Sequence, residues 1–390
     1  MEISKLKTYI QSTNVNFLFG SGLSKPYLDT LGNIEKLLTE LSNDKTIDNK
    51  VKKVIEASIY REYFTKVILH SHTINNEAAY KNVVENYANF LTVWNDIFNK
   101  RANKLLSKQL NIYTTNIDTL VEKSVEQTKV EFNDGFKGSI KQIFDESNFQ
   151  KSYSKTSLHF QNTFEIPVFN LLKMHGSINW KEENNEIIND YLLNQIKGID
   201  ETLKKIDSRN FVNCSELSEM KINTEKLITD NDKINFEILY NDFLTEYYKL
   251  IIVNPNKQKF SETVMDIHFY ELMRMYSNSL EKENSVLFVM GFSFADEHIR
   301  EITLRATKTN PTLLVVIFAY DDDQRYDFAN KTNNNNIIVL NPTKCKESNK
   351  IDDKEIEKKK IIEGITKFDL TTINSVFSLI NKEIPANYGK

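Results

Sequence analysis

Short, continuous apolar runs alternate with helical patterns along this chain, and most of the runs end in glycine or a polar side chain. Strands that are buried on both faces of a parallel sheet read as such runs, because helices cover both sides of the sheet. We count about six of them, which predicts an α/β fold: a Rossmann-like parallel sheet covered by helices on both faces. With the shorter candidates included, strands are expected at eight places: 14–19, 110–114, 130–132, 169–174, 250–254, 285–290, 312–319 and 337–340.

Polar residues follow four of these runs directly. The stretches are FLFGSGLSKP (17–26), YTTNID (113–118), LLKMHGSINW (171–180) and VMGFSFADEHI (289–299). In open α/β sheets, ligands bind outside the carboxyl ends of the strands, and parallel strands share that edge. We therefore expect the four stretches to converge on one edge of the sheet.

The first stretch has the layout of a phosphate cradle. A strand, a glycine turn and a helical pattern with its apolar face at Ile34, Leu37, Leu38 and Leu41 follow one another. Gly20 and Gly22 would let the backbone approach a diphosphate, and the amides at the helix N-terminus would face it. The usual GxGxxG fingerprint is not completed, because Lys25 stands at its third glycine. An ordinary glycine-containing turn between strand and helix is the alternative.

Three side chains at strand ends are candidates for chemistry. Asn116 and Asp118 follow the second strand, and His175 ends another and is followed at once by Gly176. Helix capping is the alternative for the first two, because both residue types cap well. A structural role is the alternative for the histidine.

Two long stretches interrupt the alternating pattern, at about 45–107 and 181–249. Both indicate helical insertions, which would cover a ligand or form an interface. We expect a catalytic domain over 1–343 that carries them, followed by a charged linker and a C-terminal helix over 344–390.

Composition narrows the classes of function. The 390 residues are 40% hydrophobic and carry a net charge of −4, so nothing demands nucleic acid or an anionic membrane as a partner. The two cysteines, Cys214 and Cys345, cannot build a four-cysteine zinc site. We find neither an apolar signal core nor a run long enough to span a bilayer, and we expect a soluble, cytoplasmic protein.

Taken together, the motifs resemble the sirtuin family, and its bacterial branch more closely than the histone-deacetylase branch. The segment 20–24 is similar to the family's GAGxS loop, 115–118 to its TQNxD element with Thr115 in place of glutamine, and His175-Gly176 to its catalytic HG pair. KMHGSINW and GFSFADEHI resemble sirtuin-like effectors of bacterial antiphage defence. The resemblance covers roughly residues 10–342 without the insertions, and it extends to Gly291-Phe292-Ser293 as a GxS loop and to Leu340-Asn341 as the late strand-end asparagine near the adenosine.

The resemblance implies that NAD is bound as a substrate. Asn116 would position the ribose and the attacking water, Asp118 would contact the nicotinamide side or hold Asn116, and His175 would contact the ribose hydroxyls and accept a proton. The implied contacts to the rest of the dinucleotide are Gly20, Ser21, Gly22, Ser24, Thr115, Gly291, Ser293 and Asn341.

The implied function is an NAD⁺ glycohydrolase that yields nicotinamide and ADP-ribose and serves as an abortive-infection effector. Family members that deacylate proteins carry a four-cysteine zinc module after the HG motif, and this chain cannot supply one, so no zinc is expected. A homo-oligomer is expected, and the implied trigger is assembly or a partner such as a HerA-like hexameric ATPase. An NAD-dependent deacylase or ADP-ribosyltransferase and a non-catalytic module that senses NAD or ADP-ribose are the alternatives.

Overall fold

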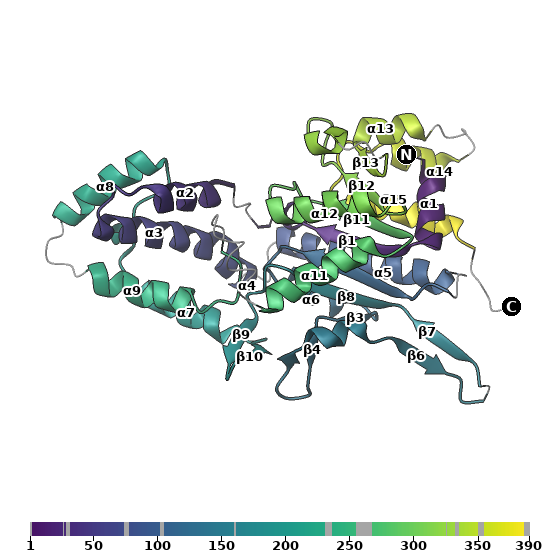
Figure 1. Ribbon diagram of the computed structural model, residues 1–390, viewed down its shortest axis with the longest axis horizontal. Coiled ribbons are helices and arrows are strands. Elements are labelled where there is room, and N and C mark those ends of the chain that lie inside the picture. Colours follow the sequence, from purple (N-terminus) through teal and green to yellow (C-terminus); the bar gives the residue numbers. More distant parts are fainter. Residues whose placement is uncertain are drawn as a thin grey trace.

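The computed structural model describes residues 2–25, 27–28, 32–73, 78–101, 105–159, 161–230, 236–254, 267–324, 326–331, 335–349 and 355–385. Within them, seven parallel strands form one sheet, which confirms the predicted Rossmann-like α/β fold (Figure 1). The strand order is β13 (Ile337–Leu340), β12 (Leu314–Phe318), β11 (Ser285–Met290), β1 (Asn14–Phe19), β2 (Gln109–Thr114), β8 (Val168–Lys173) and β3 (Glu131–Asn133).

The strand order reverses between β1 and β11. From β1 the chain builds outward through β2 to β3 and β8, and it then returns to place β11 on the other side of β1. Such a switch point leaves a crevice at the carboxyl ends of the two central strands, where open α/β sheets bind ligands. The loops after β1 and β11 therefore face each other at the predicted edge.

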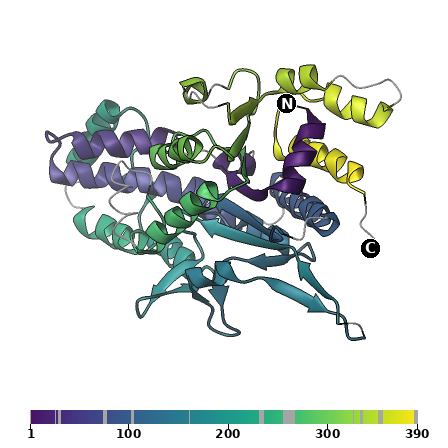
Figure 2. The same ribbon diagram turned by 45° about the vertical axis from the view of Figure 1, so that its right-hand side comes forward.

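Helices cover both faces of the sheet (Figures 1 and 2). Phe17 and Phe288 point to one face, where Trp94 packs with ring centroids 4.8 and 5.7 Å away. Leu18 and Leu287 alternate to the other face. The first face carries α1 (Ile3–Ser12), α5 (Ala78–Lys100) and α15 (Leu370–Glu383), and the second carries α11 (Ile267–Glu281) and α12 (Glu297–Thr309).

A helical lobe stands beside the sheet and has an apolar core of its own (Figure 1). Both predicted insertions contribute to it, and the helix α5 of the first insertion instead packs on the sheet. A π-helical turn, Phe64–Leu69, follows α3 where the lobe meets the sheet. The lobe consists of α2 (Gly32–Asn43), α3 (Asn49–Tyr63), α7 (Asn194–Lys204), α8 (Leu217–Asp230) and α9 (Phe236–Tyr247).

Two predictions of secondary structure were wrong. The start of the second insertion is a hairpin, because Asn184 and Asn185 adopt φ of 55° and 61°, the left-handed pair that a tight hairpin turn needs. Its strands, β9 (Trp180–Glu183) and β10 (Glu186–Asn189), extend a small antiparallel sheet with β4 (Phe136–Lys137) and β5 (Ile143–Phe144). The expected strand at 250–254 makes only a bridge between Gly176 and Ile252.

Several other elements complete the described chain. The expected helix over 264–280 is α11, and residues 264–266 lie outside the described residues. A second hairpin, which the sequence did not indicate, is formed by two largely exposed strands. The remaining elements are β6 (Tyr153–Thr156), β7 (Thr163–Ile166), α4 (His70–Thr73), α6 (Leu120–Val125), α13 (Pro342–Ser348) and α14 (Ile356–Glu363).

A ladder of asparagine side chains crosses four strands of the sheet. Asn111 Nδ2 donates to Asn16 Oδ1 at 3.0 Å, Asn170 Nδ2 to Asn111 Oδ1 at 2.9 Å, and Asn133 Nδ2 to Asn170 Oδ1 at 3.0 Å. The four residues are also direct partners in strand register. A strand that slipped by one residue would break these bonds, so the ladder fixes the register of the sheet.

We expect Asn170→Leu to lower the free energy of unfolding by about 2 kcal/mol, because it removes a donor from Asn111 and an acceptor from Asn133, and each buried group left unpaired costs about 1–3 kcal/mol. Urea unfolding followed by circular dichroism measures the loss. Asn278→Ala, at an exposed position of α11, is the matched control and should change it by less than about 0.5 kcal/mol. Equal effects of the two substitutions would rule out a structural role for the ladder.

Candidate functional site

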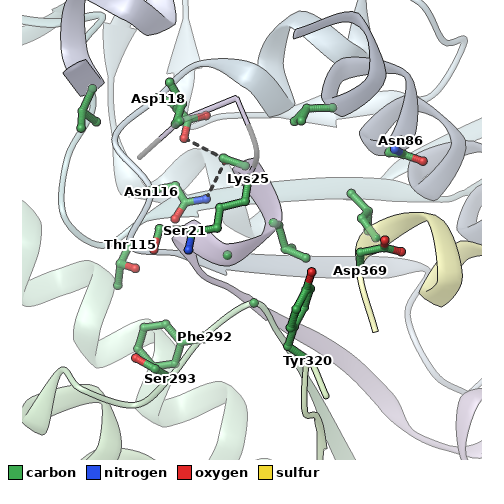
Figure 3. A pocket seen from close by; sticks show the side chains of 18 of the residues that line it. Ser21, Lys25, Asn86, Thr115, Asn116, Asp118, Phe292, Ser293, Tyr320 and Asp369 are labelled. Carbon is green, nitrogen blue, oxygen red and sulfur yellow. Dashed lines mark hydrogen bonds between the residues drawn. The ribbon is translucent and has the colours of Figure 1, made fainter. Parts of the chain in front are cut away.

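The loops at the carboxyl edge of the sheet enclose a cleft of about 1210 Å³ (Figure 3). The cleft lies over the switch point between β1 and β11. Residues of all four stretches line it, at the predicted edge of the sheet. Its walls come from the ends of five strands, from α5, from the helical lobe and from the segment before α15. Residues from the strand ends include Ser21, Gly22, Ser24, Thr115, Asn116, Asp118, His175, Gly291, Ser293, Asp296 and Tyr320.

The floor of the cleft is made by two glycine loops in backbone contact. Gly20 N donates to Met290 O and Gly22 N to Gly291 O, both at 3.0 Å. A Cβ placed on Gly20 would lie 2.4 Å from Gly291 O, and Gly291 itself has φ of +61°. Glycine is required here because the two loops approach each other more closely than any side chain allows.

The helical part of the expected phosphate cradle is not formed as predicted. Residues Ser21–Ser24 make a 3-10 turn, and α2 begins only at Gly32, in the lobe. The first helix N-terminus after β1 is thus this short turn. Ser21 is exposed at the cleft, whereas Ser24 is buried.

Asn116, Asp118 and Ser24 form one hydrogen-bonded group (Figure 3). Asn116 Nδ2 donates to Gly20 O at 3.2 Å and lies 3.5 Å from Ser24 Oγ, which donates to Asp118 Oδ2 at 3.3 Å. Asp118 Oδ1 accepts from Leu120 N, the first amide of α6, at 3.0 Å, while the N-cap residue of the helix is Thr119. The Asp118 carboxylate therefore binds a helix amide through one oxygen and Ser24 through the other.

One acceptor in this group has no partner. Asn116 Oδ1 is buried and lacks a hydrogen-bond partner among the described residues, although the amide nitrogen of the same side chain is bonded. A buried acceptor without a partner costs free energy. A hydroxyl or water reaches this oxygen only when the Asn116 side chain turns toward the cleft that it lines.

Two buried tyrosines lie next to this hydrogen-bonded group, and the sequence did not indicate that they belong to the site. Tyr87 Oη, on α5, lies 3.5 Å from Ser24 Oγ, and Tyr63, at the end of α3, lines the cleft. Burial and then the Asp118 carboxylate raise the pKa of both phenols far above the usual range. The two phenols therefore stay neutral. Both sit in helical stripes of apolar residues, which is why the pattern indicates only core packing for them.

A buried ion pair ties the loop after β2 to the loop after β8. Lys173 Nζ donates to Glu122 Oε1 and to Ser177 Oγ, both at 2.8 Å, and to the carbonyl oxygen of Asp118. Burial raises the pKa of Glu122, while Lys173 opposes the rise. Because Lys173 bonds the Asp118 backbone, the pair holds the carboxylate loop against the histidine loop.

Backbone hydrogen bonds to the segment 251–253 hold the loop that carries His175. Val253 N donates to His175 O at 2.9 Å, and Ser177 N donates to Ile251 O at 3.2 Å. Gly176 has φ of +72°, and a Cβ there would lie 2.0 Å from Ile251 O. The segment predicted as a strand at 250–254 thus acts as a clamp on the histidine loop.

The His175 side chain contacts Asp296 from the loop after β11. The Nε2–Oδ2 distance is 3.2 Å, and the two side chains are 13% and 12% exposed. No sequence pattern assigns a role to Asp296. In the loop that carries Asp296, Phe294 adopts a left-handed backbone conformation with φ of +60°. Tyr326 Oη donates a hydrogen bond to Phe292 O of the same loop at 3.0 Å.

The segment before α15 supplies the far wall of the cleft (Figure 3). Phe368 N donates to Tyr320 O at 2.7 Å, and Thr371 Oγ1 donates to Asn86 Oδ1 on α5 at 3.1 Å. Asp369 caps α15 at the same wall. The stretch predicted as a linker and helix therefore takes part in the cleft.

Most of the predicted site residues lie together, and two do not line the cleft. Gly20 lies beneath the floor in contact with Gly291. Asn341, expected near an adenosine, caps α13 by accepting from Lys344 N at 2.8 Å, and it is not among the residues that line the cleft. The strand-end position of Asn341 is equally suited to capping, and capping is the role that the structure shows.

The chain has no significant match to a model of a known protein family or to a curated protein. No helix within the described ranges has the length and apolar character needed to cross a membrane. The same ranges contain no group of three or more His, Cys, Asp or Glu side chains placed to hold a metal ion.

Proposed function

We propose that this protein is an NAD⁺ glycohydrolase that cleaves NAD⁺ to nicotinamide and ADP-ribose. The observation that carries the proposal is the meeting of Asn116, Asp118 and His175 in one cleft, over two glycine loops at the switch point of a parallel sheet. The same loops bear the resemblance to sirtuins. A cleft of about 1210 Å³ has room for a dinucleotide.

In this reaction the main task of the protein is to position the substrate and one water molecule. The nicotinamide of NAD⁺ is a cationic ring that leaves as a neutral molecule, so the transition state resembles an oxocarbenium ion. The protein must orient the ribose, exclude bulk water and deliver one water molecule. The unpartnered Asn116 Oδ1 is an acceptor suited to holding that water or a ribose hydroxyl, and the Asp118 carboxylate favours positive charge nearby.

His175 supplies the acceptor for a proton. Its side chain is 13% exposed, so it is held by the protein while still lining the cleft. A neutral imidazole accepts a proton through its unprotonated ring nitrogen, and it is the side chain most often used for general base catalysis. The resemblance to antiphage effectors further supports control of the activity by self-assembly or by a partner such as a HerA-like hexameric ATPase.

The test is to incubate the purified protein with NAD⁺, at low and at high protein concentration, and to quantify nicotinamide and ADP-ribose beside His175→Ala. Cleavage that depends on His175 and needs no acceptor supports the proposal. Release of nicotinamide only after an acylated or acceptor protein is added would replace it by deacylation or ADP-ribosyl transfer. Binding of NAD⁺ without any cleavage in the assembled protein would favour a sensing module.

A further inference from the structure

A carboxylate and an imidazole meet across the mouth of the cleft. In the sheet, β2 and β1 lie between β8 and β11, so the ends of β8 and β11 are about 14 Å apart at the usual strand spacing. The loops after these strands nevertheless bring Asp296 Oδ2 to 3.2 Å from His175 Nε2. The pair therefore joins the loop after β8 to the loop after β11, which is one of the two loops of the glycine floor.

Asp296 is itself held in one orientation. Its Oδ1 accepts from His298 N at 3.1 Å and from Ile299 N at 3.2 Å, which caps α12. The cap fixes Oδ1, so Oδ2 is the oxygen directed at the imidazole. A carboxylate oxygen only accepts hydrogen bonds, so this contact favours the imidazole tautomer that carries its hydrogen on Nε2.

We propose that Asp296 is a positioning residue that holds His175 in the Nε2–H tautomer and leaves Nδ1 as the proton acceptor. The inference rests on the proposed function. As the water oxygen bonds to C1′ of the ribose, the C1′–nitrogen bond breaks and its electron pair stays on the nicotinamide nitrogen, which leaves neutral. The water gives its proton to His175 Nδ1, and the Asp296 carboxylate stabilises the imidazolium that results.

Asp296→Asn separates this role from capping. Asparagine caps helices as well as aspartate does, so α12 keeps its cap through Oδ1. The amide nitrogen replaces Oδ2 and presents a donor to His175 Nε2, which favours the opposite tautomer. Asp48→Asn, at the exposed cap of α3 where Oδ1 accepts from Lys50 N, is the matched control because it makes the same exchange away from the cleft.

The experiment records long-range proton–nitrogen NMR spectra of the full chain over a series of rising pH values, and the tautomer is read where the ring signals no longer change with pH. The signal of His175 is assigned by its loss in His175→Ala. Asp296→Asn should convert the His175 pattern from Nε2–H to Nδ1–H and should lower kcat for NAD⁺ about tenfold to a hundredfold, with KM and the urea midpoint close to those of the parent. Asp48→Asn should change neither the pattern nor kcat.

An unchanged His175 tautomer in Asp296→Asn, or an unchanged kcat, would overturn the inference. A loss of kcat that tracks a loss of stability would show that Asp296 is only a cap. A switch of tautomer in a protein that leaves NAD⁺ intact would uphold the positioning of His175 and defeat the proposed reaction, so the two failures can be told apart.

Discussion

Asn116→Ala is expected to lower the turnover of NAD⁺ by about a hundredfold or more, which is the usual worth of a group that orients the reactants. The substitution removes the unpartnered Oδ1, our candidate for holding the attacking water or a ribose hydroxyl. It also removes the amide nitrogen that ties the loop after β2 to Gly20 O. Single-turnover cleavage of NAD⁺, followed by the release of nicotinamide, measures the effect on chemistry.

The result is informative only if the variant is folded, so urea unfolding is measured on the same preparation. Asn278→Ala, the exposed exchange on α11, should retain the parent rate. Full turnover in a folded Asn116→Ala protein would remove Asn116 from the mechanism.

Gly20→Ala is expected to open the floor of the cleft. The added Cβ would lie 2.4 Å from Gly291 O and 2.6 Å from Phe292 Cα, and both are backbone atoms of the loop after β11. No rotamer relieves such an overlap, so β1 and β11 must separate at their carboxyl ends. We expect a loss of at least about 3 kcal/mol in the free energy of unfolding, in the upper range for a single substitution, together with loss of NAD⁺ binding.

Gly198→Ala provides the matched control. Gly198 lies within α7, and no atom lies within 4 Å of a Cβ placed there. Alanine should therefore stabilise the helix by about 0.5–1 kcal/mol. Should Gly20→Ala prove as stable as the parent in urea unfolding and bind NAD⁺ in calorimetry, the close approach of the two loops would not be needed for the site.

The strands of the main sheet could be predicted because a strand that is buried on both faces is a short, continuous apolar run in the sequence. SVLFVM at 285–290 and NVNFLF at 14–19 are the clearest examples, and both became neighbouring central strands. Because these strands pair in parallel, their carboxyl ends lie at the same edge of the sheet. Asn116, Asp118 and His175 lie along that edge for the same reason.

Features that depend on side-chain partners far away in the chain could not be predicted. Asp296 is 121 positions from His175 in the sequence, so no local pattern signals their contact. Tyr63 and Tyr87 occupy apolar helical stripes, and only the tertiary fold brings them to Asp118. The hairpin turn at Asn184-Asn185 has a local signal, because asparagine tolerates positive φ, but the polar pattern around it predicts a helix.

The most direct test is cleavage of NAD⁺ by the purified protein in water enriched in oxygen-18. The proposed reaction yields nicotinamide and ADP-ribose in equal amounts, with one heavy oxygen at C1′ of the ribose, and His175→Ala yields no product. Nicotinamide without ADP-ribose, or ADP-ribose without the heavy oxygen, would contradict the claim that this cleft delivers water to the ribose.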